Sequence, residues 1–232
     1  GARAAGATAI KLAPKSPRAL LIWARMQKAD GDLDGAEKTL SESLARPVPP
    51  KLALGSLELL SDLYEQTGDY EAAGEAYRRQ LEIAPDAAWT KGNYAGYLTR
   101  KGDFDGAIAM AKKALAQMDY GAAHYALAKA HCAKGEQELW DRGDAKDEAL
   151  ECAKRVRPQS GEIYEKASYL RAVLLAQDAR DGEALEALDS VRTVNQRHLL
   201  ASLLRAQIFE RAQRFEDAAA VLEDAREFGG ER

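Results

Sequence analysis

The sequence predicts an all-α protein built from repeated helical hairpins, and three observations support this prediction. Glycine–alanine pairs return at a nearly constant interval, apolar residues recur at helical spacing around each pair, and aromatic residues are scarce. The 232 residues are 46% hydrophobic and 30% charged, which is typical of an ordered chain. Because only 7% are aromatic, the core must consist mainly of Ala and Leu, which suits closely packed helices.

The interval is measured at an alanine that follows a glycine by five residues. The pairs are Gly31–Ala36, Gly68–Ala73 and Gly102–Ala107. Successive alanines are 73 − 36 = 37 and 107 − 73 = 34 residues apart, and Ala184 and Ala218 are again 34 apart. A small residue stands twelve positions before each alanine, as a helix crossing requires: Ala24, Ser61, Ala95, Ala172 and Ala206. A bulky residue is expected four positions after it, where Leu40, Tyr77, Leu188 and Leu222 comply and Ala111 does not. Such a period indicates a repeat architecture.

Each period contains two amphipathic helices joined by a short turn, as residues 54–85 illustrate. Apolar residues recur every three or four positions before Gly68 and again after it, so each helix carries one apolar stripe. Gly68 supplies a turn conformation that other residues resist. Pro85 ends the second helix because it cannot donate the next helical hydrogen bond.

Residues 60–85, LSDLYEQTGDYEAAGEAYRRQLEIAP, resemble the tetratricopeptide repeat. The matching residues are Tyr64, Gly68, Tyr70, Ala73, Tyr77 and Pro85. The resemblance covers nearly the whole chain in six units, although the fifth and sixth carry Ala179 and Gln213 in place of the turn glycine. It implies a right-handed α-α superhelix, or solenoid, of about six hairpins whose first helices line a concave groove.

We expect one solenoid domain. Residues 1–16 form the last turns of a preceding repeat helix, as in a domain excised from a longer protein. The six repeats occupy residues 17–53, 54–87, 88–120, 121–164, 165–198 and 199–232. The fourth has a lengthened hairpin, since the step from Gly121 to Glu165 is 165 − 121 = 44 residues. We place the extra length around Trp140, with a second helix from about Ala145 to Val156.

The resemblance implies a protein-interaction scaffold or adaptor that binds a peptide or helical segment of a partner in this groove. The family's groove positions that we select as the binding site are Trp89, Asn93, Arg100, Tyr125, Lys129 and Tyr169. An Asn amide suits an extended peptide backbone, Arg and Lys suit acidic side chains, and aromatic rings offer rigid contacts. The alternative is a solvated helix face with scattered charges.

Further groove positions carry over along the chain: Leu21, Arg25, Lys28, Glu58, Asp62, Glu65, Lys166, Val173, Leu203 and Gln207. The basic residues among the first six can pair with the acidic ones across neighbouring helices. Co-chaperone members of the family clamp a terminal carboxylate, and Asn93 occupies one of their Asn positions. Glu58 and Asp62 precede it and would repel a carboxylate, so we exclude that function.

The sequence predicts neither an enzyme nor a cofactor or metal site. It contains no HExxH, paired CxxC or dinucleotide-binding glycine motif. Cys132 and Cys152 are interpreted as small buried apolar residues on neighbouring antiparallel helices. His124 and His131 lie two turns apart on the inward stripe, so we interpret them as core residues rather than zinc ligands. His198 has no evident partner.

The net charge of −4 and the lack of a basic stripe argue against nucleic-acid binding. No apolar run approaches the roughly 20 residues of a membrane span, and no secretory signal peptide is present. We expect a cytoplasmic protein, with the periplasm left open, and the composition hints at a bacterial source. The alternatives are a self-associating structural module, hence a homo-oligomer, or the non-catalytic superhelical domain of a larger enzyme or of a secretion or envelope-biogenesis protein.

Overall fold

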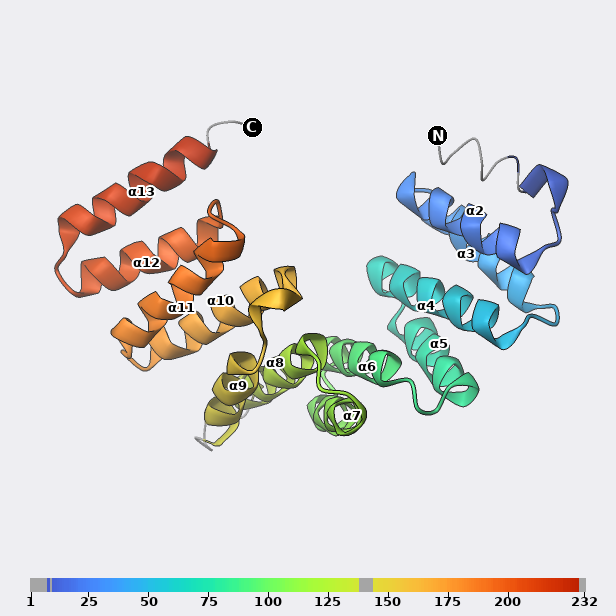
Figure 1. Ribbon diagram of the computed structural model, residues 1–232, viewed down its shortest axis with the longest axis horizontal. Coiled ribbons are helices and arrows are strands. Elements are labelled where there is room, and N and C mark those ends of the chain that lie inside the picture. Colours follow the sequence, from blue (N-terminus) through green and yellow to red (C-terminus); the bar gives the residue numbers. More distant parts are fainter. Residues whose placement is uncertain (1–7, 9, 138–143, 230–232) are drawn as a thin grey trace. The chain divides into compact units, whose positions relative to one another are not determined.

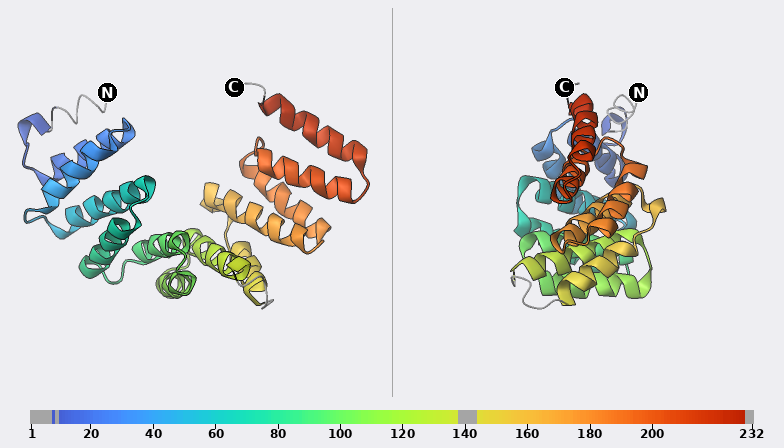
Figure 2. Two further views of the ribbon diagram at one scale, coloured as in Figure 1. Left: turned by 180° about the vertical axis from the view of Figure 1, so that it is seen from behind. Right: turned by 90° about the vertical axis from the view of Figure 1, so that its left-hand side faces the viewer.

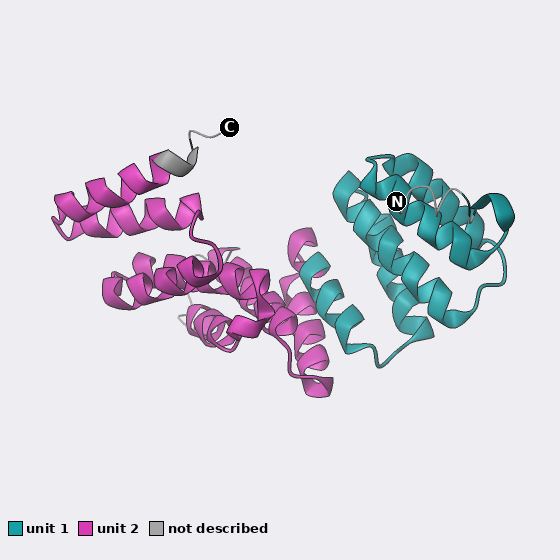
Figure 3. Ribbon diagram, turned by 45° about the horizontal axis from the view of Figure 1, so that its top comes forward, with its two compact units in different colours: residues 1–97 teal, residues 98–232 magenta. Residues whose placement is uncertain are grey.

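The computed structural model describes residue 8, residues 10–137 and residues 144–229. These residues are predominantly α-helical and contain no β-strand (Figures 1 and 2), so the predicted all-α fold of helical hairpins is confirmed. The chain divides into two compact units, Gly1–Tyr97 and Leu98–Arg232 (Figure 3).

The first unit contains two helical hairpins and most of a further helix. One hairpin pairs α2 (Pro17–Ala29) with α3 (Leu33–Leu44), and the next pairs α4 (Pro50–Thr67) with α5 (Tyr70–Ile83). α6 (Ala88–Lys101) follows, and the division between the units falls within it.

The second unit begins with the end of α6 and continues through packed helical pairs. Its elements are α7 (Phe104–Gln117), α8 (Gly121–Gln137), α9 (Asp144–Lys154), the 3-10 turn η1 (Pro158–Ser160), α10 (Glu162–Gln177), α11 (Asp181–Val194), α12 (Leu199–Arg211) and α13 (Phe215–Gly229). The helices α8 and α9, α10 and α11, and α12 and α13 pack as hairpins. α8 has 17 residues and α9 has 11. The extension expected around Trp140 lies outside the described residues.

The small residues expected at helix crossings are all buried. This holds for both positions of each period: Ala24, Ala36, Ser61, Ala73, Ala95, Ala107, Ala172, Ala184, Ala206 and Ala218. The bulky residue four positions on is buried at Leu40, Tyr77 and Leu188. Leu222 departs from this pattern with 37% exposure, because no later helix among the described residues covers that side of α13.

The described turns inside the hairpins keep one backbone geometry whatever residue occupies them. Gly31, Gly68 and Gly102 have φ of +83°, +80° and +87°, and Ala179 and Gln213 take φ of +55° and +59° at the corresponding places. In each of these turns the next residue donates its N–H to the carbonyl five positions earlier, over 2.8 to 3.0 Å. This is the helix-ending bond of a Schellman motif. It requires a left-handed residue, for which glycine has the lowest conformational cost.

The residue after the turn caps the second helix only where glycine precedes it. Asp32, Asp69 and Asp103 each accept a hydrogen bond from the backbone N–H three residues on, at 2.9 to 3.0 Å. In the last two hairpins an arginine stands there instead. Arg180 and Arg214 bind the acidic residue three positions on and supply no oxygen to the helix N–H groups. These two turns therefore lack both the favoured left-handed residue and the favoured cap.

A cluster of tyrosines joins α5 to α6 in the first unit. The rings of Tyr77, Tyr94 and Tyr97 lie 5.3 to 5.6 Å apart between centroids. The hydroxyl of Tyr97, a buried side chain, donates to the backbone carbonyl of Tyr70 at 2.5 Å. Aromatic pairs of this kind stabilise packing beyond the effect of the apolar area that they bury. The cluster therefore holds α5 against α6.

His124 and His131 are core residues, as predicted from the inward stripe, and Cys132 is buried as predicted, whereas Cys152 is only partly buried. Cys132 and Cys152 are free thiols in adjacent apolar clusters between α8, α9 and α10. His131 is buried and lies with Nδ1 2.8 Å from Glu148 of α9. Burial lowers the pKa of His131, although Glu148 acts in the opposite direction. His124 is buried as well.

Glycine at the two non-glycine turns should stabilise the protein. For Ala179→Gly and for Gln213→Gly we expect the free energy of unfolding to rise by about 0.5–1 kcal/mol, because the left-handed cost of an L-residue exceeds the added freedom of the unfolded chain. The free energy of unfolding is measured by urea unfolding followed by circular dichroism. The matched control is Gly102→Ala, where an added Cβ meets no atom within 4 Å, so any loss of stability is a backbone effect. Unchanged or lower stability in both glycine variants would contradict the argument.

The thiols should be almost inert in the folded protein. Burial and the nearby Glu136 raise the pKa of Cys132 to about 12, and burial also raises the pKa of Cys152. Since the thiolate is the reactive form, we expect a chromogenic disulfide reagent at mildly alkaline pH to react roughly a hundredfold more slowly than after unfolding in urea. The Cys132→Ala variant isolates Cys152. Equal rates before and after unfolding would refute the burial of these thiols.

Candidate functional site

Two acidic side chains on α4, a first helix of the first unit, have partners. Lys28 of α2 forms an ion pair with Asp62 of α4, and Glu65 accepts a 2.7 Å hydrogen bond from the hydroxyl of Tyr77. The predicted pairing of basic residues on α2 with acids on α4 is thus confirmed for Lys28. Leu21 was wrongly assigned to the groove: it is 7% exposed and packs in the core between α2 and α4.

Trp89 and Asn93 lie on the part of α6 that belongs to the first unit. The side chain of Trp89 is 50% exposed, while Asn93 is half-buried. Within the described part of the chain, no residue hydrogen-bonds to the amide of Asn93. The amide of Asn93 is therefore available to a partner as a donor and acceptor, and the half-exposed indole of Trp89 offers apolar surface.

The first helices of the second unit bring basic and aromatic side chains together. The ammonium of Lys129 on α8 lies 5.9 Å from the ring centroid of Tyr125, a cation–π distance. Burial of this ammonium lowers the pKa of Lys129, and the positive charges of Arg100 and Lys166 lower it further. We call these four residues the basic cluster: Arg100, Tyr125, Lys129 and Lys166.

The members of the basic cluster differ in how their charges are balanced. Lys166 of α10 forms a 2.6 Å ion pair with Glu162 one turn earlier, which raises the pKa of Lys166. Lys129 has no ion pair with any of the described residues. Tyr125 is half-buried, and desolvation raises its pKa. The cluster therefore places the ammonium of Lys129, which has no ion pair among the described residues, beside one half-buried ring.

Tyr169, the remaining candidate, makes a separate contact further along α10. Its ring centroid lies 4.9 Å from that of His198, whose Nδ1 accepts the N–H of Ala201 at 3.1 Å and so caps α12. The Nε2 of His198 lies 3.6 Å from Glu165. His198 therefore has partners, although none was evident from the sequence. Two of them, Tyr169 and Glu165, lie on α10 of the preceding hairpin.

A shallow apolar hollow of about 260 Å³ lies between α10 and α12 on the first helices of the second unit. It is lined by Val173, Ala176, Gln177, Leu204, Gln207, Ile208 and Arg211. Arg211 is held at its edge, where the guanidinium donates to the carbonyl of Ala176 at 3.0 Å and pairs with Asp181. Val173 and Gln207 were both among the positions carried over from the family's groove.

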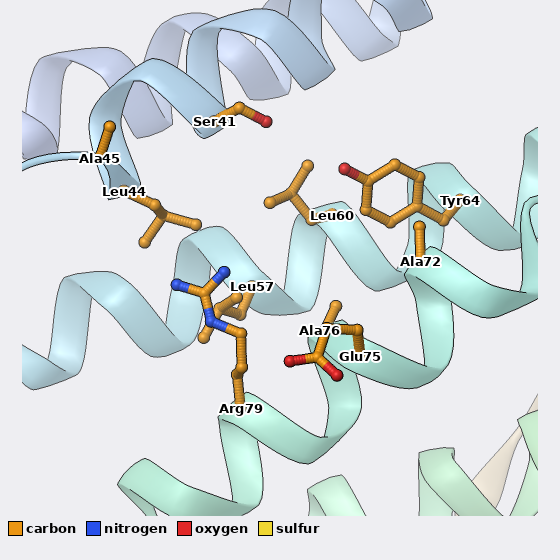
Figure 4. A pocket seen from close by; sticks show the side chains of 10 residues that line it. All are labelled: Ser41, Leu44, Ala45, Leu57, Leu60, Tyr64, Ala72, Glu75, Ala76 and Arg79. Atoms are coloured by element: carbon orange, nitrogen blue, oxygen red, sulfur yellow. The ribbon is translucent and has the colours of Figure 1, made fainter.

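Another hollow, which sequence reasoning missed, lies between α3, α4 and α5 (Figure 4). Its volume is about 320 Å³, and Leu44, Leu57, Leu60 and Tyr64 form its apolar wall. Figure 4 shows Leu60 of α4 between α3 and α5, with Arg79 extending from α5. No periodicity could reveal it, because it depends on how far α3 and α5 stand apart.

Among the described residues, no three His, Cys, Asp or Glu side chains are grouped as metal ligands would be. None of the described helices has the length and apolarity needed to cross a membrane.

Comparison with known proteins supports the hairpin fold. Tetratricopeptide repeat models match residues 54–87 and residues 169–231. A search of curated proteins found no match.

Several solved structures share the fold. PilW, a widely conserved type IV pilus biogenesis factor, aligns with a TM-score of 0.67 at 18% identity, over 91% of this chain and 90% of its own. The pilF protein of Pseudomonas aeruginosa gives 0.68 at 16% identity, over 93% and 97%. A tetratricopeptide repeat protein of Parabacteroides merdae gives 0.65 at 18% identity, over 92% and 78%. Residues 54–87 and residues 169–231 therefore match the tetratricopeptide repeat, and the described hairpins have the fold of that repeat.

Proposed function

We propose that the chain is a protein-interaction scaffold that binds an acidic peptide or helical segment of a partner on the first helices of its second unit. The observation that carries this proposal is the basic cluster, in which Lys129 lies near two further cations and lacks an ion pair among the described residues. Tetratricopeptide repeats in general serve as scaffolds, which supports the broader part of the proposal.

The charge arrangement favours an acidic ligand. Like charges around Lys129 raise the free energy of the unbound surface, and a carboxylate placed between them would reverse the sign of each interaction. Arg100 can bind such a carboxylate through two parallel hydrogen bonds. The ring of Tyr125 beside the ammonium excludes water from one side, which strengthens the attraction.

The neighbouring surface suits an apolar side chain of the same ligand. The hollow between α10 and α12 offers Val173, Leu204 and Ile208, while the half-buried ring of Tyr169 is held by His198. Rigid aromatic and aliphatic contacts of this kind often dominate binding energy. Because the helices are already ordered, mainly the ligand loses conformational freedom on binding.

Two alternatives stay open as proposals. Exposed leucines on the first turns of α12, namely Leu199, Leu200 and Leu203, favour self-association through that surface. The similarity to PilW, a type IV pilus biogenesis factor, favours a scaffold within a secretion or envelope-biogenesis system. A molecular mass that stays that of a monomer over a wide concentration range would exclude self-association.

The two lysines of the basic cluster should differ in chemical reactivity. Because only the neutral amine is nucleophilic, Lys129 with its lowered pKa should acylate several-fold faster than Lys166, whose pKa Glu162 raises. Limiting acetylation followed by mass spectrometry measures both rates in one sample. A bound acidic segment should slow the reaction of Lys129. Slower acylation of Lys129 than of Lys166 in the free protein would contradict the charge arrangement described above.

Removing the cations of the basic cluster should weaken partner binding. We would capture a partner from native lysate on the wild-type chain and then measure its dissociation constant with purified proteins. For the Arg100→Ala, Lys129→Ala double variant we expect it to rise about tenfold or more, as the loss of charged hydrogen bonds implies.

The control for this measurement is Lys113→Ala, which removes an exposed cation from the second helix α7. If the control variant weakened partner binding equally, the change in net charge alone would explain the effect. A partner bound equally well by the wild type and the double variant would move the site elsewhere, and capture of the chain alone would favour self-association.

A further inference from the structure

A polar hollow of about 450 Å³ lies at one end of the α8–α9 hairpin and plays no part in the proposed peptide surface. It is lined by Leu115, Asp119, His124, Lys154, Arg155 and Arg157. These residues come from the end of α7, the connection to α8, the first turn of α8, and the end of α9 with the segment after it. Three of the side chains are cationic and one is a carboxylate.

The fold holds the two arginines in place through the residue between them. Val156 is 2% exposed and packs with Ala153 and Ala167 in the core of the second unit. Its burial fixes the backbone on both sides, so Arg155 and Arg157 flank an anchored position. Gly121 brings the same segment against α8, since a Cβ there would lie 2.3 Å from Ser160 Oγ and 3.3 Å from Val156.

The carboxylate of Asp119 leaves much of this positive charge unbalanced. Asp119 lies 2.6 Å from Nε2 of His124, a side chain only 6% exposed. Hydrogen bonding to His124 lowers the pKa of Asp119 most, and the charges of Arg157 and Arg155 lower it further. Asp119 therefore stays ionised and is held on the His124 side of the hollow.

The three cations have few other partners. Arg155 lies 3.4 Å from Glu151 in an exposed pair, which contributes little. Among the residues that the structure describes, Lys154 and Arg157 have no ion-pair partner. The three cations contribute three positive charges, and Asp119 and Glu151 contribute two negative charges. The net charge of these five groups is +3 − 2 = +1.

We propose that this hollow binds a phosphate group, held by Arg157 and Lys154 with Arg155 in support. Guanidinium groups match the oxygens of phosphate in paired hydrogen bonds, and an ammonium adds a point charge. The first turn of α8 lies at the same place, and the N-terminal end of a helix favours an anion. Since the five charges sum to +1, the hollow attracts an anion.

Two sources could present this group, free phosphate or a phosphorylated side chain of a partner. The test uses the full chain labelled with ¹⁵N and titrated with inorganic phosphate at constant ionic strength. We expect saturable shifts of the amide signals of residues 119–124 and 154–157, and about a tenfold or greater loss of affinity in the Lys154→Gln, Arg157→Gln double variant. The matched control is Lys38→Gln on α3, an exposed cation far along the chain, which should bind as the wild type does.

A second arm identifies the source. A short phosphoserine peptide that binds at least about tenfold more tightly than inorganic phosphate would assign the site to phosphorylated side chains. Equal or weaker binding of that peptide would assign it to free phosphate. Both variants replace exposed side chains, and urea unfolding should show unchanged stability.

Three results would overturn the proposal. The first is the absence of saturation up to about 10 mM phosphate. The second is equal affinity in the double variant, and the third is the same set of shifts produced by chloride at matched ionic strength. None of these outcomes bears on the peptide surface, because the basic cluster uses Arg100, Lys129 and Lys166 and its variants are separate.

Discussion

The close approach of two helices at buried alanines is the constraint on which the rest of the structure depends. In α2–α3 the alanines are Ala24 and Ala36, 36 − 24 = 12 residues apart, and both lie in one core cluster. The pairs Ala172–Ala184 and Ala206–Ala218 repeat this spacing in the second unit. A larger side chain would separate the helices, so the alanines determine which stripe of each helix faces inward. The opposite stripe is thereby left for charged and aromatic side chains, which is where the candidate binding surface lies.

The turn between the helices shows that backbone geometry is maintained even where residue identity is not. Ala179 and Gln213 adopt the left-handed conformation of the glycines and form the same turn hydrogen bond. The packing of the two helices against each other outweighs a local cost of about 1–2 kcal/mol. The arginines that replace the capping aspartates show the same tolerance, since each is balanced by an acid three residues later.

The local arrangement of charges in the second unit matters more for binding than the net charge of the chain does. The chain has a net charge of −4, yet cations gather on two surfaces of this unit that serve different chemistry. In the basic cluster they lie beside tyrosines and an apolar hollow, which suits a segment of protein. Around Asp119 they line a polar hollow, which suits a compact anion. Since charges are screened over about 8 Å at physiological salt, each surface is governed by its own few residues.

Periodicity in the sequence was enough to predict the hairpin fold, the places of the turns and the small buried residues, because it follows from the geometry of a single helix. It also indicated the buried positions of His124, His131 and Cys132, while a binding role for Arg100, Tyr125 and Lys129 stays a prediction. The division of the chain into repeats of a single solenoid stays a prediction. The three-dimensional structure was needed to show that Leu21 is buried, that His198 caps α12 beside Tyr169, and that residues 119–124 meet residues 154–157. These features depend on contacts between hairpins, and no local pattern in the sequence records how closely two separate segments approach.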